Sequence, residues 1–131
     1  MNGCYDIVHL GHLRSFNESR MYGDTLVVAI NSDESIKKLK GPSRPINSQE
    51  DRKEFLENII DVDHVFIFDS TDVCEILKKI KPNVWLKSGY TIETINKQEY
   101  ATALQLGIEV VFLPISKDIS TSAIVNKIRN E

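Results

Sequence analysis

The sequence predicts an α/β protein with a parallel sheet and helices on both of its faces. Short apolar runs rich in Val, Ile and Phe alternate along the chain with amphipathic segments, and this alternation is typical of parallel strands connected by helices. Several of the amphipathic segments also begin after a serine that suits a helix N-cap, namely Ser32, Ser48 and Ser120. These observations predict both the fold class and several of its helix starts.

The first half of the chain contains four expected elements. Apolar residues at helical spacing predict a helix over 10–22 that ends near Gly23, and the run TLVVAIN predicts a buried strand over 25–31. A short helix is expected over 33–40. A longer one begins after Ser48, with acidic residues in its first turn, and its expected buried stripe consists of Phe55, Leu56, Ile59 and Ile60.

The second half continues the alternation without a repeat or a linker. The expected strands cover 64–68, 83–87 and 108–114, the expected helices cover 72–81 and 94–106, and a terminal helix begins at Ser120. In an open sheet of this class, ligands gather at the carboxyl ends of the strands. We therefore expect Asn31, Lys87 and Pro114 to emerge at the edge that binds the ligand.

Composition limits the function classes. The chain has 131 residues, 41% hydrophobic residues and a net charge of −3, which predicts a single domain over 1–131 and argues against nucleic-acid binding. Neither a membrane-spanning run nor a signal pattern is present, so the expected compartment is the cytoplasm. Cys4 and Cys74 make no disulfide framework, and Cys4 suits a small buried thiol better than a nucleophile.

The most informative segment is NGCYDIVHLGH at 2–12, which places His9 and His12 three residues apart at the start of a helix. Residues at this spacing share a helix face, and the N-terminus of a helix favours anions through its free N–H groups and its dipole. If Gly11 leaves room beside them, both imidazoles add hydrogen-bond donors to a phosphate site.

Two other interpretations of the histidine pair stay open at this point. A zinc site needs three or more protein ligands, and His64, Cys4 and Cys74 offer no convincing spacing for them, so no metal ligand is predicted. The histidines can also simply cap or pack the helix.

Positive charge is concentrated in one region. Lys37, Lys38 and Lys40 precede Gly41, and Arg44 and Arg52 follow. Such a run is usually a solvated helix face, but beside a phosphate-binding helix Lys40 and Arg52 become candidates for an anion clamp.

Several segments together carry a family resemblance. NGCYD and HLGH resemble the GxFD and HxGH signatures of the cytidylyltransferase-like nucleotidyltransferases, and ISTSAIVNKI at 119–128 resembles their ISTT-type motif. SDESIKKLKGPSRPINSQEDR at 32–52 and LKSGYTIETI at 86–95 are most similar to the adenylyltransferase domain that makes ADP-heptose from heptose 1-phosphate. The resemblance runs almost end to end, and it implies a Rossmann-like open parallel sheet of strand order 3-2-1-4-5.

This resemblance also implies a set of site residues. His9 and His12 would contact the triphosphate and stabilise charge at the α-phosphate, and Lys40 joins them as a catalytic residue through its position in KLKG. The implied nucleotide-binding residues are Asn2, Gly3, Cys4, Asp6, Gly11, Arg52, Ser120 and Thr121. Asp6 can alternatively serve as an ordinary loop carboxylate and Ser120 as a simple helix cap.

For the reaction, the resemblance implies ATP as substrate, Mg²⁺ bound with the nucleotide and a sugar phosphate as acceptor. A homodimer is the family expectation. Lys87, Gly89 and Tyr90 are the implied acceptor-binding residues. The chain departs from the family here, because Lys87-Ser88-Gly89-Tyr90-Thr91 lacks the aspartate of the KGGDY motif. Ile115 also stands near the position of an arginine in glycerol phosphate cytidylyltransferases.

Three functions therefore stay open. The first is transfer of AMP to a sugar 1-phosphate, with D-glycero-D-manno-heptose 1-phosphate as the expected acceptor. The second is cytidylyl transfer to glycerol phosphate or a related polyol phosphate. The third is a non-catalytic nucleotide-binding module.

The implied fold has a central strand immediately before NGCYD, where this sequence has only Met1. Without that strand, two inner sheet edges are unpaired and a slot opens in the core. We therefore expect the natural protein to carry about five to eight further apolar residues upstream.

Overall fold

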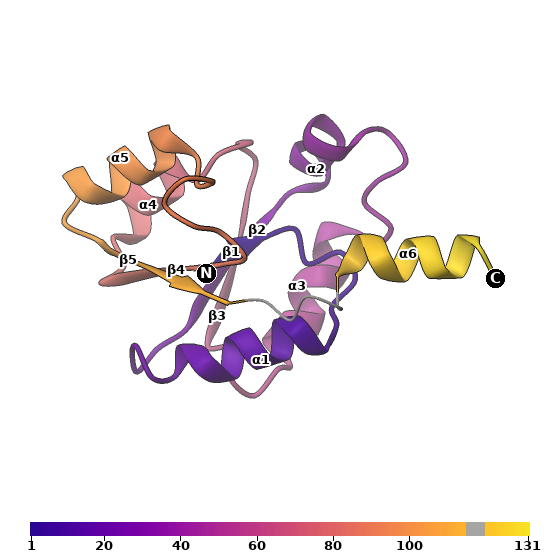
Figure 1. Ribbon diagram of the computed structural model, residues 1–131, viewed down its shortest axis with the longest axis horizontal. Helices are drawn as coiled ribbons and strands as arrows, with labels where there is room; N and C mark the ends of the chain where they lie inside the picture. The colour runs from indigo at the N-terminus through magenta and orange to yellow at the C-terminus, as the bar shows by residue number, and fades with distance from the viewer. Residues whose placement is uncertain (115–119) are drawn as a thin grey trace.

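The computed structural model describes residues 1–114 and 120–131, and in these residues strands and helices alternate as expected (Figure 1). The elements in chain order are β1 (Asn2–Gly3), α1 (Leu10–Ser19), β2 (Val27–Asn31), α2 (Asp33–Lys40), α3 (Gln49–Glu57), β3 (His64–Phe68), α4 (Cys74–Ile80), β4 (Val84–Ser88), α5 (Lys97–Gln105), β5 (Glu109–Leu113) and α6 (Thr121–Arg129).

All described strands pair in parallel, but they form two separate groups. The first has the order β1-β2-β3 and the second pairs β4 with β5. Within the groups, Asn2 lies opposite Ala29, Val27 opposite His64 and Val84 opposite Glu109. The order agrees with the predicted 3-2-1-4-5, with two differences. A two-residue β1 exists within the NGCYD segment itself, and β1 and β4 are not paired as strands.

Helices cover both faces of the sheet, as predicted, and each face has its own core. One core contains Phe16 of α1 and Leu56 of α3 together with Val28 and Ile30 of β2. The other is formed by α4, α5 and the opposite face, with the buried residues Ala29, Phe68, Val73, Leu77, Trp85, Ile95, Ala103 and Ile108. Helix α6 extends away from the rest of the molecule (Figure 1), and none of its described residues is buried.

The predicted serine caps are present. The hydroxyls of Ser32, Ser48 and Ser120 each accept a hydrogen bond from the backbone N–H of the residue three positions later in the chain, at 3.2, 3.2 and 3.0 Å. The stripe predicted for the third helix is only half right, because Phe55 is 58% exposed and Ile60 is 91% exposed. Since α3 ends at Glu57, Ile60 lies beyond the helix and cannot continue its buried face.

None of the helices in the described part of the chain has the length and apolar character that crossing a bilayer requires.

Gly3 is required by packing. A Cβ at this position would lie 3.1 Å from Cε2 of Tyr5, whose ring is buried against Phe16. We predict that Gly3→Ala lowers the free energy of unfolding by about 1–3 kcal/mol through overpacking, measured by denaturant titration. Gly23→Ala is the matched control, because a Cβ there has nothing within 4 Å. Equal stability of the two variants would contradict the prediction.

Candidate active site

His9 and His12 form a reciprocal cap at the start of α1. The Nδ1 atom of His9 accepts a hydrogen bond from the N–H of Gly11 at 3.1 Å, and Nδ1 of His12 accepts one from the N–H of His9 at 3.1 Å. The two rings are stacked, with centroids 3.9 Å apart. The two Nδ1 atoms therefore cap the helix, as the capping interpretation predicts. The Nε2 atom of each imidazole takes no part in this cap.

These contacts fix the chemical state of both rings. A neutral imidazole that accepts through Nδ1 carries its proton on Nε2, so each ring presents an Nε2–H donor. Burial lowers the pKa of His9, and burial together with the neighbouring His9 lowers the pKa of His12 to about 4. Neither Nε2–H has a hydrogen-bond partner in the described part of the chain, so both are available to a ligand as uncharged donors.

The low pKa of His12 gives a pH prediction. The unfolded chain binds a proton at the ordinary value of 6.5, whereas the folded chain binds it only near 4. The unfolded state therefore holds more protons between these values, and stability should rise with pH from about 4 to 6.5. Denaturant titrations of the protein and of His12→Gln across this range test it. An unchanged pH slope in His12→Gln would contradict the assignment.

Tyr5 supports this pair and is a residue that the sequence analysis missed. Its backbone has φ of 49°, and its buried ring lies 5.1 Å from the ring of His12 and 5.5 Å from that of Phe16. A non-glycine residue in the left-handed region is uncommon, so Tyr5 holds a strained turn between β1 and α1. The sequence carries no signal for that conformation.

The serine–threonine turn of α6 lies against the loop 4–9 between β1 and α1, which we call the histidine loop. The Oγ1 atom of Thr121 donates to the carbonyl of Ile7 at 3.1 Å, although the two residues are 114 positions apart. Ser120 is the N-cap of α6, and its hydroxyl accepts from the N–H of Ala123. The sequence-predicted meeting of this turn with the histidine loop is therefore present, while Ile115 and Ile119 lie outside the described residues.

Asp6 anchors the loop that precedes α3. Its buried carboxylate accepts hydrogen bonds from the N–H of Ile46 at 2.8 Å, from the N–H of Asn47 at 2.8 Å and from Nε of Arg44 at 3.0 Å. Burial opposes ionisation, but these donors outweigh it and the pKa of Asp6 lies below its usual value. The arrangement fits the alternative of a loop carboxylate.

Arg52 ties three segments together from inside the protein. The side chain is buried, and Nη1 donates to the carbonyls of Cys4 and Asn31 at 2.8 and 2.7 Å. Nη2 pairs with Asp33 at 2.9 Å and Nε donates to the carbonyl of Asn47 at 3.0 Å. Four of its N–H groups are thus engaged by the protein, and Arg52 positions the ends of β1 and β2.

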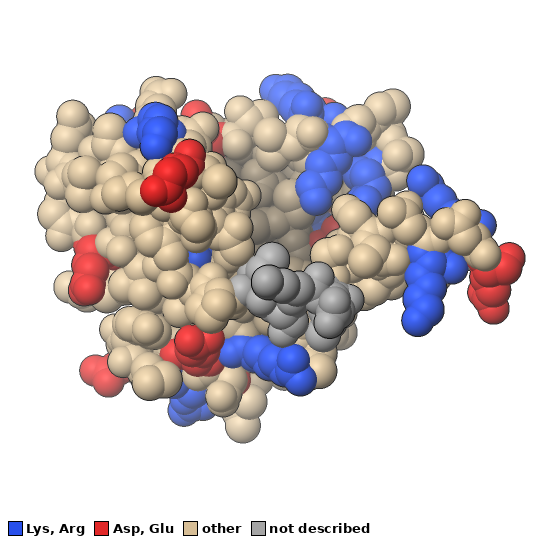
Figure 2. Space-filling model, in the orientation of Figure 1, with Lys and Arg blue, Asp and Glu red and all other residues tan. Residues whose placement is uncertain are grey.

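Lys40 is exposed at the last position of α2 and forms no hydrogen bond or ion pair with any described residue. Figure 2 shows Lys and Arg side chains gathered over this helix. Burial raises the pKa of the Cys4 thiol, and the charges of Lys40, Arg52 and Arg44 oppose this shift. Positive charge therefore surrounds the end of β1, where Cys4 Sγ lies 3.8 Å from Oδ1 of Asn31.

Lys87 occupies an aromatic setting at the end of β4. Its ammonium lies 5.1 Å from the ring centre of Trp85 and 4.1 Å from that of Tyr90, and burial lowers its pKa. Gly89 has φ of 80°, and its N–H donates to the carbonyl of Leu113 at 3.0 Å. This turn brings the partly exposed Tyr90 back over Lys87.

Two polar contacts connect this second region to β1 and α1, the elements on either side of the histidine loop. Nε1 of Trp85 donates to Oδ1 of Asn2 at 2.8 Å, and the hydroxyl of Ser88 donates to that of Ser15 on α1 at 3.1 Å. Of the three residues expected to emerge at the ligand-binding edge, Asn31 is the last residue of β2 and Lys87 the next-to-last of β4, and both are buried, whereas Pro114 directly follows β5. No group of three or more His, Cys, Asp and Glu side chains within the described residues suits a metal ion.

Comparisons with known proteins agree with this arrangement. Residues 1–127 match the family model described as cytidylyltransferase-like. The chain is 46% identical over 106 residues to "Bifunctional protein HldE" of Aliarcobacter butzleri, covering 80% of this chain and 22% of that protein. It is 43% identical over 131 residues to the protein of the same name from Alcanivorax borkumensis, covering 99% and 27%.

The fold is similar to the crystal structure of the lipopolysaccharide core biosynthesis protein from Thermoplasma volcanium, with a TM-score of 0.71 and 28% identity. The match covers 88% of this chain and 93% of that one. The chain spans about a quarter of the length of the curated relatives that it matches.

Proposed function

Because the chain belongs to the cytidylyltransferase-like family of nucleotidyltransferases, we propose that it transfers AMP from ATP to a sugar 1-phosphate and releases pyrophosphate. The preferred acceptor is D-glycero-D-manno-heptose 1-phosphate. The observation that carries the proposal is the convergence of two neutral imidazoles, the N-terminus of α1 and the turn of Thr121 on one loop. The similarity to the HldE proteins supports the choice of reaction.

The chemistry needs positioning and charge stabilisation more than proton transfer. An oxygen of the acceptor phosphate attacks the α-phosphorus, the bond from that phosphorus to the bridging oxygen breaks, and pyrophosphate leaves with the electron pair. The second pKa of a phosphate monoester is about 6, so the attacking group is ionised at neutral pH without a general base. Donors aimed at the developing charge supply the main stabilisation in such reactions.

In this mechanism the residues divide into donors and supports. The Nε2–H groups of His9 and His12 donate to phosphoryl oxygens, and Lys40 provides an exposed positive charge at the end of α2. Thr121 and Ser120 bring the N-terminus of α6 toward the outer phosphates. Asp6 and Arg52 act as positioning residues, since the protein itself already uses their polar atoms.

Magnesium fits this site only as a partner of the nucleotide. The described residues offer no cluster of metal ligands, and Mg²⁺ characteristically binds through phosphates and water with few carboxylates. When bound with ATP, it neutralises phosphate charge.

The acceptor is assigned to the region around Lys87. The buried Lys87 ammonium suits the phosphate of the acceptor, and the exposed Tyr90 lies with its ring against this ammonium. Gly89 shapes the turn that brings these two side chains together. Because this loop lacks the aspartate of the KGGDY motif, the choice of acceptor is tested with two different phosphates.

Pyrophosphate release tests the proposal directly. ATP, CTP and GTP are each combined with heptose 1-phosphate or glycerol 3-phosphate, and we expect the highest turnover with ATP and heptose 1-phosphate. Preference for CTP with glycerol 3-phosphate would favour cytidylyl transfer instead. Nucleotide binding by calorimetry without turnover in any pair would favour a binding module.

A further inference from the structure

A chain of hydrogen bonds runs from the end of β4 to the histidine pair. The hydroxyl of Ser88, the last residue of β4, donates to the hydroxyl of Ser15 on α1 at 3.1 Å, and the Ser15 hydroxyl donates to the carbonyl of Gly11 at 3.1 Å. The N–H of Gly11 donates in turn to Nδ1 of His9 at 3.1 Å. We call Ser15 and Ser88 the serine bridge, and its far end holds the residue that caps His9.

The serine bridge connects the two strand groups beside the candidate active site. β1 and β4 are not paired as strands. Ser15 lies on α1, which packs on the first group, whereas Ser88 ends a strand of the second. In the chain, Ser88 stands between Lys87 and Gly89, and Gly11 precedes the second histidine directly. The bridge therefore joins residues assigned to the acceptor with residues assigned to the α-phosphate.

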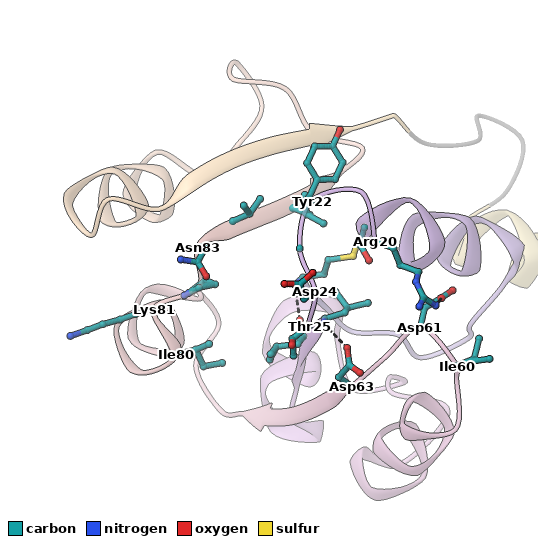
Figure 3. Close-up of a pocket in the computed structure, with 18 residues that line it drawn as sticks. Arg20, Tyr22, Asp24, Thr25, Ile60, Asp61, Asp63, Ile80, Lys81 and Asn83 are labelled. Carbon is teal, nitrogen blue, oxygen red and sulfur yellow. Dashed lines mark hydrogen bonds and ion pairs between the residues drawn. The ribbon is translucent and has the colours of Figure 1, made fainter.

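The largest cavity in the described part of the chain lies elsewhere. Its volume is about 770 Å³, and two of its walls are residues 23–27, which lead into β2, and residues 80–84, around the start of β4. Figure 3 shows this open space, with Lys81 and Asn83 on one side of Asp24. The cavity lies at the amino ends of the strands, and neither serine of the bridge lines it.

The bond between the two serines is more than the burial of Ser15 requires. A serine inside a helix can satisfy its hydroxyl by donating to a carbonyl of the preceding turn. Ser19, buried on the same helix, does this with the carbonyl of Phe16. Ser15 is buried as well and has its own such bond to Gly11, yet its oxygen also accepts from Ser88. Ser88 is only partly buried, so the second bond serves to hold the two elements together.

The proposed transfer depends on the alignment of two sites. An oxygen of the acceptor phosphate, assigned to Lys87, must attack the α-phosphorus held by the histidines, and a misplacement of about 1 Å costs about a hundredfold in rate. We propose that Ser15 and Ser88 are positioning residues that set this alignment by fixing the acceptor loop against the first turn of α1. The inference rests on the proposed function. Ser88 stands at the first glycine of the KGGDY motif, so this hydroxyl distinguishes the chain from the motif.

A kinetic double-mutant cycle tests the proposal. Ser15→Ala, Ser88→Ala and the double variant are compared in pyrophosphate release, and Ser19→Ala is the matched control because it removes a buried hydroxyl from the same helix without touching β4. We expect both single variants to lower kcat about ten- to hundredfold while KM for nucleotide and acceptor changes little. The double variant should be no slower than Ser15→Ala within about twofold, since losses at coupled residues do not add. Ser19→Ala should keep its kcat.

A second measurement needs no turnover. The ¹⁵N signals of the His9 imidazole, recorded at neutral pH without ligand, report the hydrogen bond at Nδ1. We expect these signals to shift in Ser15→Ala and in Ser88→Ala, although Ser88 reaches His9 only through Ser15 and Gly11. In Ser19→Ala they should stay in place.

Normal kcat in Ser88→Ala would overturn the proposal, and so would losses that multiply in the double variant. A raised KM for the acceptor with normal kcat would also overturn it, because Ser88 would then bind the acceptor itself. Unchanged His9 signals in both single variants would contradict the connection to the histidines. If the unsubstituted chain turns over no nucleotide with any acceptor, the proposed function fails, whereas the imidazole signals still decide whether the bridge holds His9.

Discussion

Replacing His12 by alanine is expected to lower turnover by about two to three orders of magnitude, as loss of one transition-state donor typically does. Alanine removes the Nε2–H donor of the neutral His12 ring. This nitrogen carries the proton because Nδ1 of His12 accepts a hydrogen bond from the N–H of His9 at 3.1 Å. The measurement is steady-state pyrophosphate release with saturating nucleotide and acceptor.

His12→Gln separates catalysis from capping. His12 is the third residue of α1, and glutamine at this position can accept from the N-cap N–H as in a capping box. We expect His12→Gln to keep the melting temperature while losing turnover, and Leu13→Ala, at an exposed position of the same helix, to change neither by much. A large thermal effect with nearly normal turnover in His12→Gln would assign His12 a structural role only.

Local rules explain which parts of the fold could be predicted. The caps at Ser32, Ser48 and Ser120 depend on residues three positions away, and sequence contains that information. The strands at 64–68 and 84–88 are short apolar runs, and the predicted bounds differ from the structure by one residue at most. The exposed Ile60 was misassigned because helical periodicity was extended past the actual helix end at Glu57.

The roles of single polar residues depend on partners far away in sequence. Sequence spacing identified Arg52 as a member of a cationic cluster, but its carbonyl partners Cys4 and Asn31 lie 48 and 21 residues away. The same holds for Lys87, whose setting is formed only when the turn at Gly89 brings Tyr90 over it. A pattern of charged residues alone cannot distinguish an arginine buried in hydrogen bonds to the protein from one that is free to bind a phosphate, because both use the same side chain.

Asp6→Ala is expected to lower the free energy of unfolding by about 3–5 kcal/mol, the usual cost of removing one partner from a buried ion pair. The change leaves the Arg44 guanidinium without its carboxylate, and Nη2 of Arg44 already has no hydrogen-bond partner in the described part of the protein. The N–H groups of Ile46 and Asn47 lose their acceptor as well. Chemical denaturation measures the loss.

A loss of about 3–5 kcal/mol is a large fraction of the total stability of a small domain, so the milder Asp6→Asn gives the decisive comparison. The amide keeps one acceptor oxygen and the shape, so the expected loss is about 1–3 kcal/mol. Asp24→Asn, at an exposed carboxylate, serves as the control.

The pH dependence of the same variants identifies the cause. The pKa of Asp6 in the folded protein lies below its ordinary value of 3.8, so its contribution is present above that value and is lost as the pH falls through the folded value. Asp6→Asn should therefore flatten this acid limb, whereas Asp24→Asn should not. If Asp6→Asn leaves the free energy of unfolding unchanged but raises KM for the nucleotide, Asp6 contacts the nucleotide instead of anchoring the loop. Loss of an anchoring carboxylate must lower the stability of the folded protein.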